Sequence, residues 1–497
     1  MSFVLYMQDY SKMETWLLRK SKGEEAVSFK WLWENRSEDA ERIYDWLKKI
    51  QSRSMIVNAR EERSDFSLVD PFGTGLSESL FSGNLIGFFR DEEGTLEIGS
   101  RFDEIGKPPY FFFHMLAALQ GGLKLNDSDV SAALETPISE LVLVFFFASM
   151  LKQAAMRGFY RRYVRFERND SRLRGSIDVA RQIRENLGLQ NGKLAYSYRE
   201  LTADNPVNHL ILHAYASVRK RFPALSEVLI DRDRGLSEFL TRLRFLAPGS
   251  RTAGVRETLG KTVQPMNDPL FPGYESLRTV CRMILRYQSA AWNTQETDHK
   301  TQGIFYYVPD LWEQYLEARF QALPAQSRNY SLKTQYEVKS YGTNGINGTM
   351  WKNIWYPDFV FFPKDDGSDS RPQFFADAKF KPSWAKAHNG KLDSNLFEDY
   401  NKCLRDMVSL NLDRCGVIFP VKPNSNVGHQ AKEHRISEFS EKCFYTIPVP
   451  VPASSADNGV MPYSEWRDVM DQSVDEVLNS FPRILTINAQ RQTKILK

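Results

Sequence analysis

The sequence predicts a protein of the mixed α/β (α+β) class that is divided into several domains. Its 497 residues exceed what one ordinary hydrophobic core organises. Hydrophobic residues make up 42% of the chain and charged residues 26%, which is typical of a folded protein. Segments with helical periodicity alternate with short apolar runs typical of strands. We therefore expect a mixed N-terminal domain over residues 1–125, a mostly helical middle region over 126–300 and a third domain over 301–497.

The N-terminal domain is expected to contain both kinds of element. The segment Trp31–Ile50 predicts a helix. Two strands, Leu85–Phe89 and Thr95–Ile98, are separated by Asp91–Gly94, whose composition is typical of a hairpin turn. A second helix is expected over Tyr110–Leu119. This domain therefore contributes at least one β-hairpin and two helices.

Helices dominate the middle region. The segment Pro137–Tyr160 is apolar around much of its circumference, which indicates a buried helix. Ser176 is expected to cap a helix that begins near Ile177. Asn205 and Pro206 begin another helix, which runs to about Arg221, because proline suits the first helical turn. Short strands are expected at 163–167 and 196–199, and further helices at 226–245 and 274–291.

The third domain changes character, because strands and helices alternate within it. We expect helices at 310–323, 395–410 and 464–480, and strands at 332–339, 354–362, 373–380, 415–421 and 443–451. The loops between these segments are rich in glycine, asparagine, aspartate and serine, as exposed turns are. The resulting order, from the first of these helices to the strand at 415–421, is αβββαβ.

Composition excludes several classes of protein. With a net charge of +3, contact with nucleic acid has to come from local basic patches. Four scattered cysteines without a CxxC pair argue against structural zinc and against a disulfide framework. Met1–Asp9 lacks the features of a secretory signal, and the most apolar run, Leu141–Met150, is too short to span a bilayer. We expect a cytoplasmic protein without membrane contact, and the absence of a GxxxxGK[ST] loop argues against nucleotide hydrolysis by this chain.

Two carboxylates and a lysine stand on two neighbouring apolar runs of the third domain. Asp358 follows Pro357 within an aromatic segment, and Asp377 and Lys379 flank Ala378 in the next one. Residues two apart on a strand share one face, so Asp377 and Lys379 point to the same side. A carboxylate pair binds a hard divalent cation such as Mg²⁺, for which Mn²⁺ is expected to substitute. A lysine beside such an ion positions water and stabilises developing negative charge.

Further residues are candidates for the same site. The main-chain carbonyl of Ala378 and the carboxylate of Glu313, on the preceding helix, are potential metal ligands. Lys381 continues the strand face of Lys379 towards solvent. Lys402 and Arg405, three apart on the following helix, are candidates for holding the DNA backbone.

A structural interpretation competes with the catalytic one, since two aspartates and a lysine also form ordinary surface ion-pair clusters. The aromatic surroundings favour the catalytic interpretation, because burying a charge is costly without a partner or a metal. His209 and His213, four apart, are interpreted as an ordinary helix face.

The pattern Pro-Asp358, then Asp377-Ala-Lys379, resembles the core of PD-(D/E)xK nucleases, and the chain as a whole resembles the McrC family. McrC proteins are the nuclease subunits of McrBC-type modification-dependent restriction systems. The resemblance extends from about residue 80. It rests on the segments Leu96–Phe102 with Tyr110–Leu116, the turn Leu173–Asp178, the helix entry Arg199–Asn208, Leu311–Glu313 and the triad of Asp358, Asp377 and Lys379.

The resemblance implies a Mg²⁺-dependent DNA endonuclease with a restriction-endonuclease-like third domain, acting in defence against foreign DNA. It implies an AAA+ partner of the McrB type, a GTPase or ATPase, which the N-terminal and middle regions contact and stimulate. It also implies that this partner recognises modified DNA, typically carrying methylcytosine. Two alternatives stay open: a regulatory adaptor of an AAA+ motor with a vestigial nuclease site, and a stand-alone DNA or RNA nuclease.

Overall fold

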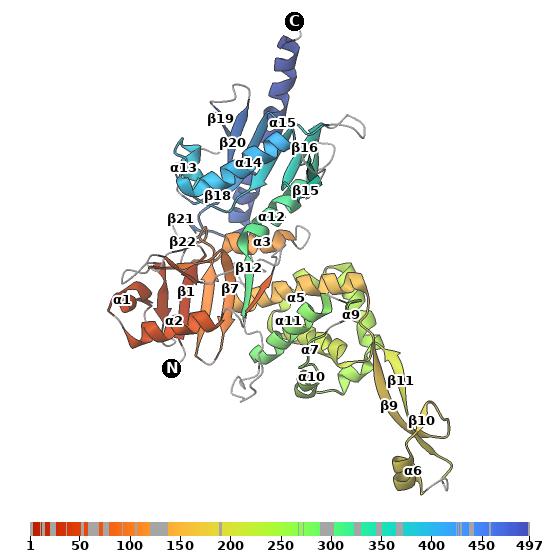
Figure 1. Cartoon of the computed structure of the whole chain (residues 1–497). Coiled ribbons are helices and arrows are strands. Elements are labelled where there is room, and N and C mark those ends of the chain that lie inside the picture. Colours follow the sequence, from red (N-terminus) through yellow and green to blue (C-terminus); the bar gives the residue numbers. More distant parts are fainter. Residues whose placement is uncertain are drawn as a thin grey trace. The chain divides into compact units, whose positions relative to one another are not determined.

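The structure is a computed structural model whose described residues form two units. One unit comprises residues 1–130 together with 302–497, and the other comprises residues 131–301 (Figure 1). The middle unit has nearly the bounds of the predicted middle region, whereas the predicted first and third domains lie in one unit. Within 3–495, the residues outside the description are 10, 12–14, 20–25, 36, 51–53, 58–68, 73–78, 92, 105–106, 120–137, 188–190, 267, 272, 289–302, 323–329, 344–349, 364–370, 424, 426, 428–429, 437–441 and 457–458.

The N-terminal sheet has the strand order β3-β2-β1-β8-β7-β12-β4 among the described residues. The predicted hairpin is confirmed, since β7 (Leu85–Arg90) pairs antiparallel with β8 (Gly94–Gly99). β1 (Phe3–Gln8) runs parallel to β8. The other members are β2 (Leu17–Arg19), β3 (Val27–Ser28), β4 (Ser54–Val57) and β12 (Gly303–Tyr307).

Strand β12 comes from the beginning of the third predicted domain, yet it lies inside the N-terminal sheet. It pairs antiparallel with β7 on one side and parallel with β4 on the other. Gly87 of β7 has a φ of +153°, and a Cβ there would collide with the main chain at Ile304. Glycine is therefore required for the close approach of these two strands. This pairing joins residues 1–130 and 302–497 into one unit.

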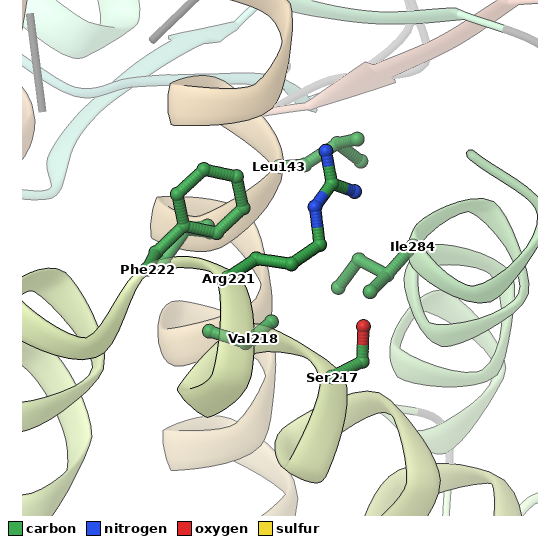
Figure 2. A pocket seen from close by; sticks show the side chains of 7 residues that line it. Leu143, Ser217, Val218, Arg221, Phe222 and Ile284 are labelled. Carbon is green, nitrogen blue, oxygen red and sulfur yellow. The ribbon is translucent and has the colours of Figure 1, made fainter. Parts of the chain in front are cut away.

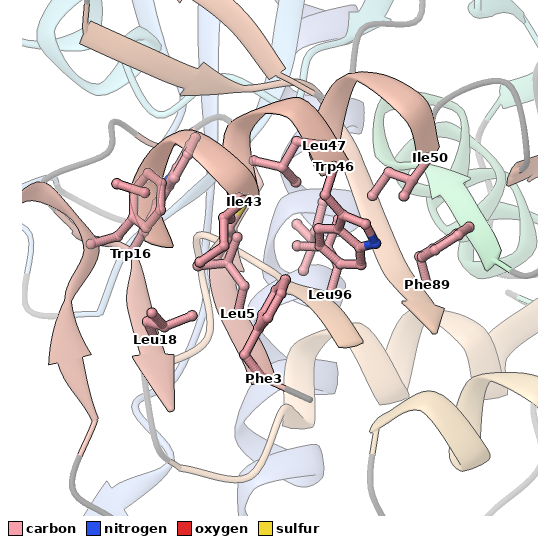
Figure 3. Packing of buried hydrophobic residues seen from close by; sticks show 14 of the residues in the cluster. Phe3, Leu5, Trp16, Leu18, Ile43, Trp46, Leu47, Ile50, Phe89 and Leu96 are labelled. Atoms are coloured by element: carbon pink, nitrogen blue, oxygen red, sulfur yellow. The ribbon is translucent and has the colours of Figure 1, made fainter. Parts of the chain in front are cut away.

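The predicted helix over 31–50 is divided in the structure. α1 (Phe29–Glu34) ends at Asn35, and α2 (Glu38–Ile50) begins after Ser37. In α2 the buried residues Ile43, Trp46, Leu47 and Ile50 recur at helical spacing, so they form one face. This face packs on buried side chains of β1, β7 and β8, which include Phe3, Leu5, Phe89 and Leu96 (Figure 3).

Three helices connect the N-terminal sheet with the rest of this unit: α3 (Tyr110–Leu119), α12 (Val308–Ala322) and α15 (Tyr463–Ile495). α3 has the predicted bounds. The carboxylate of Asp103 accepts hydrogen bonds from the backbone N–H groups of Phe111 and Phe112, at 2.8 and 3.2 Å, and so satisfies donors of the first helical turn. The hydroxyl of Tyr110 donates to the carbonyl of Met461 at 2.8 Å, just before α15.

A second sheet of this unit has the order β13-β16-β17-β18-β20-β19. Its strands are β13 (Tyr330–Thr334), β16 (Phe359–Pro363), β17 (Phe374–Ala378), β18 (Arg414–Val421), β20 (Cys443–Pro450) and β19 (Lys432–Arg435). β17, β18 and β20 are parallel, whereas β13, β16 and β17 are antiparallel neighbours. This sheet, with α12 before it and α14 before β18, has the predicted αβββαβ order with one hairpin added.

The added hairpin corrects the prediction of two long strands. β14 (Val338–Thr343) and β15 (Met350–Trp355) pair only with each other among the described residues, separately from β13 and β16. The break before β16 falls at Pro357, which has no N–H to donate to a neighbouring strand. Asp358 therefore stands at the beginning of β16 and not in its middle.

Helices cover both faces of the second sheet. α13 (Trp384–His388) and α14 (Phe397–Ser409) pack on one face, where their buried side chains join those of β16, β17, β18 and β20 in one hydrophobic cluster (Figure 1). α12 and α15 contact β17 and β20 respectively. β18 is buried along its whole length, as expected for a strand covered on both faces.

The middle unit is mostly helical. Its longer helices are α5 (Ile138–Arg157), α7 (Pro206–Arg221), α9 (Arg234–Leu246) and α11 (Gly273–Gln288). The predicted start of α7 is confirmed, because the side chain of Asn205 accepts hydrogen bonds from the N–H groups of Val207 and Asn208 at 3.1 and 3.2 Å. The described residues contain no helix with the length and hydropathy needed to cross a bilayer.

An arm built on a three-stranded sheet extends from the rest of the middle unit (Figure 1). We define the arm as β9 (Arg162–Asp170), β10 (Ser176–Ile177), α6 (Val179–Asn186) and β11 (Leu194–Thr202). The prediction that Ser176 caps the helix was wrong. Ser176 pairs with Ser197 in a strand, and Asp178 caps α6 by accepting from the N–H of Arg181 at 3.1 Å.

Candidate active site

Asp358 and Asp377 form a buried carboxylate pair in the second sheet. Phe359 pairs with Ala376 in the antiparallel register of β16 and β17, which places Asp358 opposite Asp377. Their exposed fractions are 8% and 1%. One carboxylate oxygen of Asp358 accepts a hydrogen bond from the backbone N–H of Ala378 at 2.8 Å. The pair is therefore held by the sheet itself, and it is not a surface cluster.

Two lysines face Asp377 from different elements. Lys379, directly after β17, has its Nζ in an ion pair with Asp377 Oδ2. Lys402, on α14, has its Nζ 3.5 Å from Asp377 Oδ1. The backbone N–H of Lys379 donates to the carbonyl of Ile418 at 2.9 Å, so its main chain is still fixed by β18. The side chain of Lys379 is 16% exposed and that of Lys402 is 40% exposed.

The electrostatics of the pair are asymmetric. Burial and the negative charges of Asp377 and Glu313 raise the pKa of Asp358 well above its ordinary value. Burial acts in the same direction on Asp377, but the ammonium groups of Lys379 and Lys402 outweigh it and lower the pKa of that carboxyl. These opposite directions make Asp358 the carboxyl of the pair that binds a proton more readily, whereas the surroundings of Asp377 favour its charged form.

Lys381 also turns towards this site. Its Nζ lies 2.7 Å from Oδ2 of Asp399, a 13% exposed carboxylate in the first turn of α14. The other oxygen of Asp399 lies 3.8 Å from Nζ of Lys379. Ion pairs therefore connect four of the predicted residues, partly through Asp399: Asp377, Lys379, Lys381 and Lys402. The register of β16 and β17 places Asp358 beside them.

Two predicted residues have other contacts. Glu313, on α12, accepts a hydrogen bond from Nε2 of Gln335 at 2.6 Å, although its charge acts on Asp358. Nε of Arg405 donates to Asp406 at 2.8 Å, and its guanidinium lies 5.4 Å from the ring centroid of Trp355. Within the described part of the chain, no group of three or more His, Cys, Asp or Glu side chains is arranged to hold a metal.

A family model described as "McrBC 5-methylcytosine restriction system component" matches residues 80–399 of this chain. That match spans more than half of the 497 residues and includes Asp358, Asp377 and Lys379, whereas Lys402 lies just beyond it. The chain belongs to the McrBC restriction system component family. The resemblance predicted from the sequence motifs is thereby confirmed at the level of the family.

Two solved structures resemble this McrBC component. One is a half-complex of Thermococcus gammatolerans McrB AAA+ hexamers with bound McrC, matched at 16% identity and a TM-score of 0.45 over 96% of this chain and 100% of that one. The other is a Thermococcus gammatolerans McrBC complex, matched at 18% identity and a TM-score of 0.29 over 65% of this chain and 89% of that one. No curated protein matches the chain.

The carboxylate pair of this McrBC component fits a divalent metal. Both carboxylate oxygens of Asp377 are buried, and their partners are the ammonium groups of Lys379 and Lys402 and the side chain of Asp358. Mg²⁺ typically binds one or two protein carboxylates and keeps several waters, so two carboxylates and one carbonyl suffice. Asp358, Asp377 and the carbonyl of Ala378 are thus a suitable donor set.

Asp399 is the residue that sequence reasoning missed in this McrBC component. Asp399 and Lys402 are three apart, so both face the sheet from one side of α14. The same three-residue spacing led to the prediction of Lys402 and Arg405 as DNA contacts, because DNA is expected to be bound by cationic side chains. The spacing of Asp399 from Lys402 indicates that Asp399 faces the site. The sequence does not show that Asp399 contacts Lys379 and Lys381, because these residues belong to another element.

A pocket in the middle unit is a weaker candidate site. It lies between α5, α7 and α11, is mostly apolar, and is lined by Leu143, Val144, Ser217, Val218, Arg221, Phe222 and Ile284 (Figure 2). Its empty volume of about 250 Å³ is partly open to solvent. The space that a water-sized molecule can occupy is only about 10 Å³, far below the roughly 300–1,000 Å³ that small-molecule sites usually occupy. We therefore place the candidate chemistry at the carboxylate pair.

Proposed function

We propose that this chain is the metal-dependent endonuclease subunit of its restriction system and cleaves phosphodiester bonds of DNA. The observation that carries the proposal is the buried pair of Asp358 and Asp377 with ammonium groups on one side. Burying two carboxylates costs free energy that an apolar pair would not cost. A site that binds a cation and an anionic substrate explains that cost.

Each residue has a distinct part in the proposed reaction. Asp358, Asp377 and the Ala378 carbonyl would hold Mg²⁺, which supplies a Lewis acid for the phosphate and a water of lowered pKa. Lys379 places a positive charge beside the site, where it orients the attacking water and stabilises charge on the phosphate. Lys402 and Lys381, which form ion pairs with Asp377 and Asp399, would bind phosphates of the DNA strand.

We further propose that the chain acts with an AAA+ NTPase of the McrB type, which recognises modified DNA. The proposal is supported by membership in a family of restriction system components and by the apolar end of the arm. Val179 and Ile183 are four apart on α6, and Leu187 follows directly after its last residue; the three are 65%, 62% and 73% exposed. Exposed apolar clusters of this kind mark surfaces that bind other proteins.

Plasmid cleavage tests the nuclease assignment. The full chain is mixed with Mg²⁺, its AAA+ partner, and GTP or ATP, on methylated and unmethylated DNA, and wild type is compared with Lys379→Ala. NTP-dependent cutting that the variant loses supports the proposal. If neither protein cuts while the partner's NTPase is still stimulated, the chain is an adaptor. Efficient cutting of DNA or RNA without any NTPase would identify a stand-alone nuclease.

Partner contact is tested with Ile183→Ser and the matched control Arg184→Ser. Arg184 is on the same short helix, and its side chain is 72% exposed, but it lies outside the apolar stripe. Stimulation of the partner's NTPase is expected to fall in the first variant and to persist in the second. Equal stimulation by both variants would refute the role of the arm.

A further inference from the structure

We propose that Asp399 is a positioning residue that holds the ammonium groups of Lys379 and Lys381 at the nuclease site. This inference rests on the proposed function and adds a residue to it. The supporting observation is that one carboxylate contacts both lysines. Oδ2 of Asp399 lies 2.7 Å from Nζ of Lys381, and Oδ1 lies 3.8 Å from Nζ of Lys379.

The main chain that carries the two lysines is fixed from the opposite side. Phe380, between them, is 2% exposed, and alternation along an extended chain directs it away from both lysines. Its ring packs 4.8 Å from the ring of Phe102, centroid to centroid, and is stacked on that of Phe111 at 6.3 Å. The positions of the lysine backbones are therefore set by packing, but packing does not place the ends of the long side chains.

A lysine side chain has several rotatable bonds, so its ammonium group needs a partner to stay in one place. Lys379 has two such partners, Asp377 and Asp399, which come from different elements. A metal ion bound by Asp377 competes with the ammonium group for the same carboxylate. Asp399 is not one of the proposed metal ligands. Its ion pair with Lys379 therefore persists when Asp377 binds the metal.

The position of Asp399 is itself well determined. Cys403 and Met407, four and eight residues further along α14, are buried in the cluster beneath the helix. These residues place the first turn of α14, and with it Asp399, over the end of β17. Lys402 belongs to the same helix but pairs with Asp377, so it serves as an internal comparison.

Lysine acylation of the whole, metal-free protein tests the contact directly. Wild type, Asp399→Asn and Glu398→Gln are treated briefly with an acetylating reagent, and the modified lysines are quantified by mass spectrometry. Glu398 is the exposed neighbour with the same charge. We expect about three- to fivefold faster acetylation of Lys381 and Lys379 in Asp399→Asn, and an unchanged rate at Lys402.

Cleavage then separates positioning from binding. Asp399→Asn is expected to lower kcat at least tenfold while DNA affinity measured in Ca²⁺ is unchanged or higher, because a negative charge has been removed. Asp399→Glu is expected to restore part of the rate, and Glu398→Gln to cut like wild type.

Equal acetylation of Lys379 and Lys381 in wild type and Asp399→Asn would overturn the proposal, as would a normal kcat in that variant. If the wild-type chain does not cut DNA at all but acetylation changes as expected, the nuclease assignment fails and the contact stands. The two failures are therefore distinguishable.

Discussion

Replacing Asp358 by asparagine is the change whose consequences follow most directly from the site. Asparagine has the shape of protonated aspartic acid. In wild type the N–H of Ala378 donates a hydrogen bond to the Asp358 carboxylate at 2.8 Å, and the side-chain carbonyl oxygen of asparagine can accept the same bond. Its amide group can donate to Asp377, whose oxygens are buried beside the side chain of residue 358. We therefore expect the variant to fold, and to lose cleavage.

The magnitude comes from proton linkage. The raised pKa of Asp358 means that the folded protein binds a proton that the unfolded chain has released. The associated stability is fully present below the unfolded value near 4 and is lost as pH rises towards the folded pKa. One group that titrates only in the folded state changes stability by roughly 1 kcal/mol per pH unit, so wild type is expected to lose on the order of 1–3 kcal/mol relative to the variant between pH 5 and 7.

Urea unfolding followed by tryptophan fluorescence measures this difference. Wild type and Asp358→Asn are compared in EDTA at several pH values, with Glu398→Gln as the control for loss of one negative charge. Added Mg²⁺ is expected to stabilise wild type and not Asp358→Asn. A difference between the two proteins that does not change from pH 5 to 7 would refute the assignment of the proton to Asp358.

Three other predictions concern catalysis and stability. Lys379→Ala should lower kcat by a factor of about 10²–10⁴ with Mg²⁺ binding retained, measured by single-turnover cleavage and calorimetry; a smaller effect would remove Lys379 from the chemistry. Phe380→Ala should cost about 3–5 kcal/mol of unfolding free energy in urea because its ring fills the space beside Phe102 and Phe111, and a loss below 1 kcal/mol would contradict that packing. Burial raises the pKa of Asp103 to about 7, so this carboxyl should make wild-type stability fall as pH rises from about 4 through 7, and Asp103→Asn should show a shallower fall than wild type in the same assay.

Elements determined by neighbouring residues were predicted from the sequence. The β7–β8 hairpin was found because Asp91 begins its turn, and Oδ1 of Asp91 does accept from the N–H groups of Glu93 and Gly94, at 2.9 and 3.1 Å. α7 was found because Asn205 and Pro206 are a local start signal. The break between α1 and α2 was missed although residues 34–39 are all polar and Ser37, directly before α2, is a typical residue at a helix start.

The sequence by itself determined the mixed class and most of the strands and helices, and it supplied the residues that we propose to bind a metal or a phosphate. These features depend on periodicity, turn residues and side-chain chemistry, all of which are local. The tertiary structure alone decided that β12 completes the N-terminal sheet, that Lys402 faces Asp377 and that Asp399 holds two lysines. Those contacts join residues that are distant along the chain, and they depend on sheet register and helix packing, which no single segment encodes.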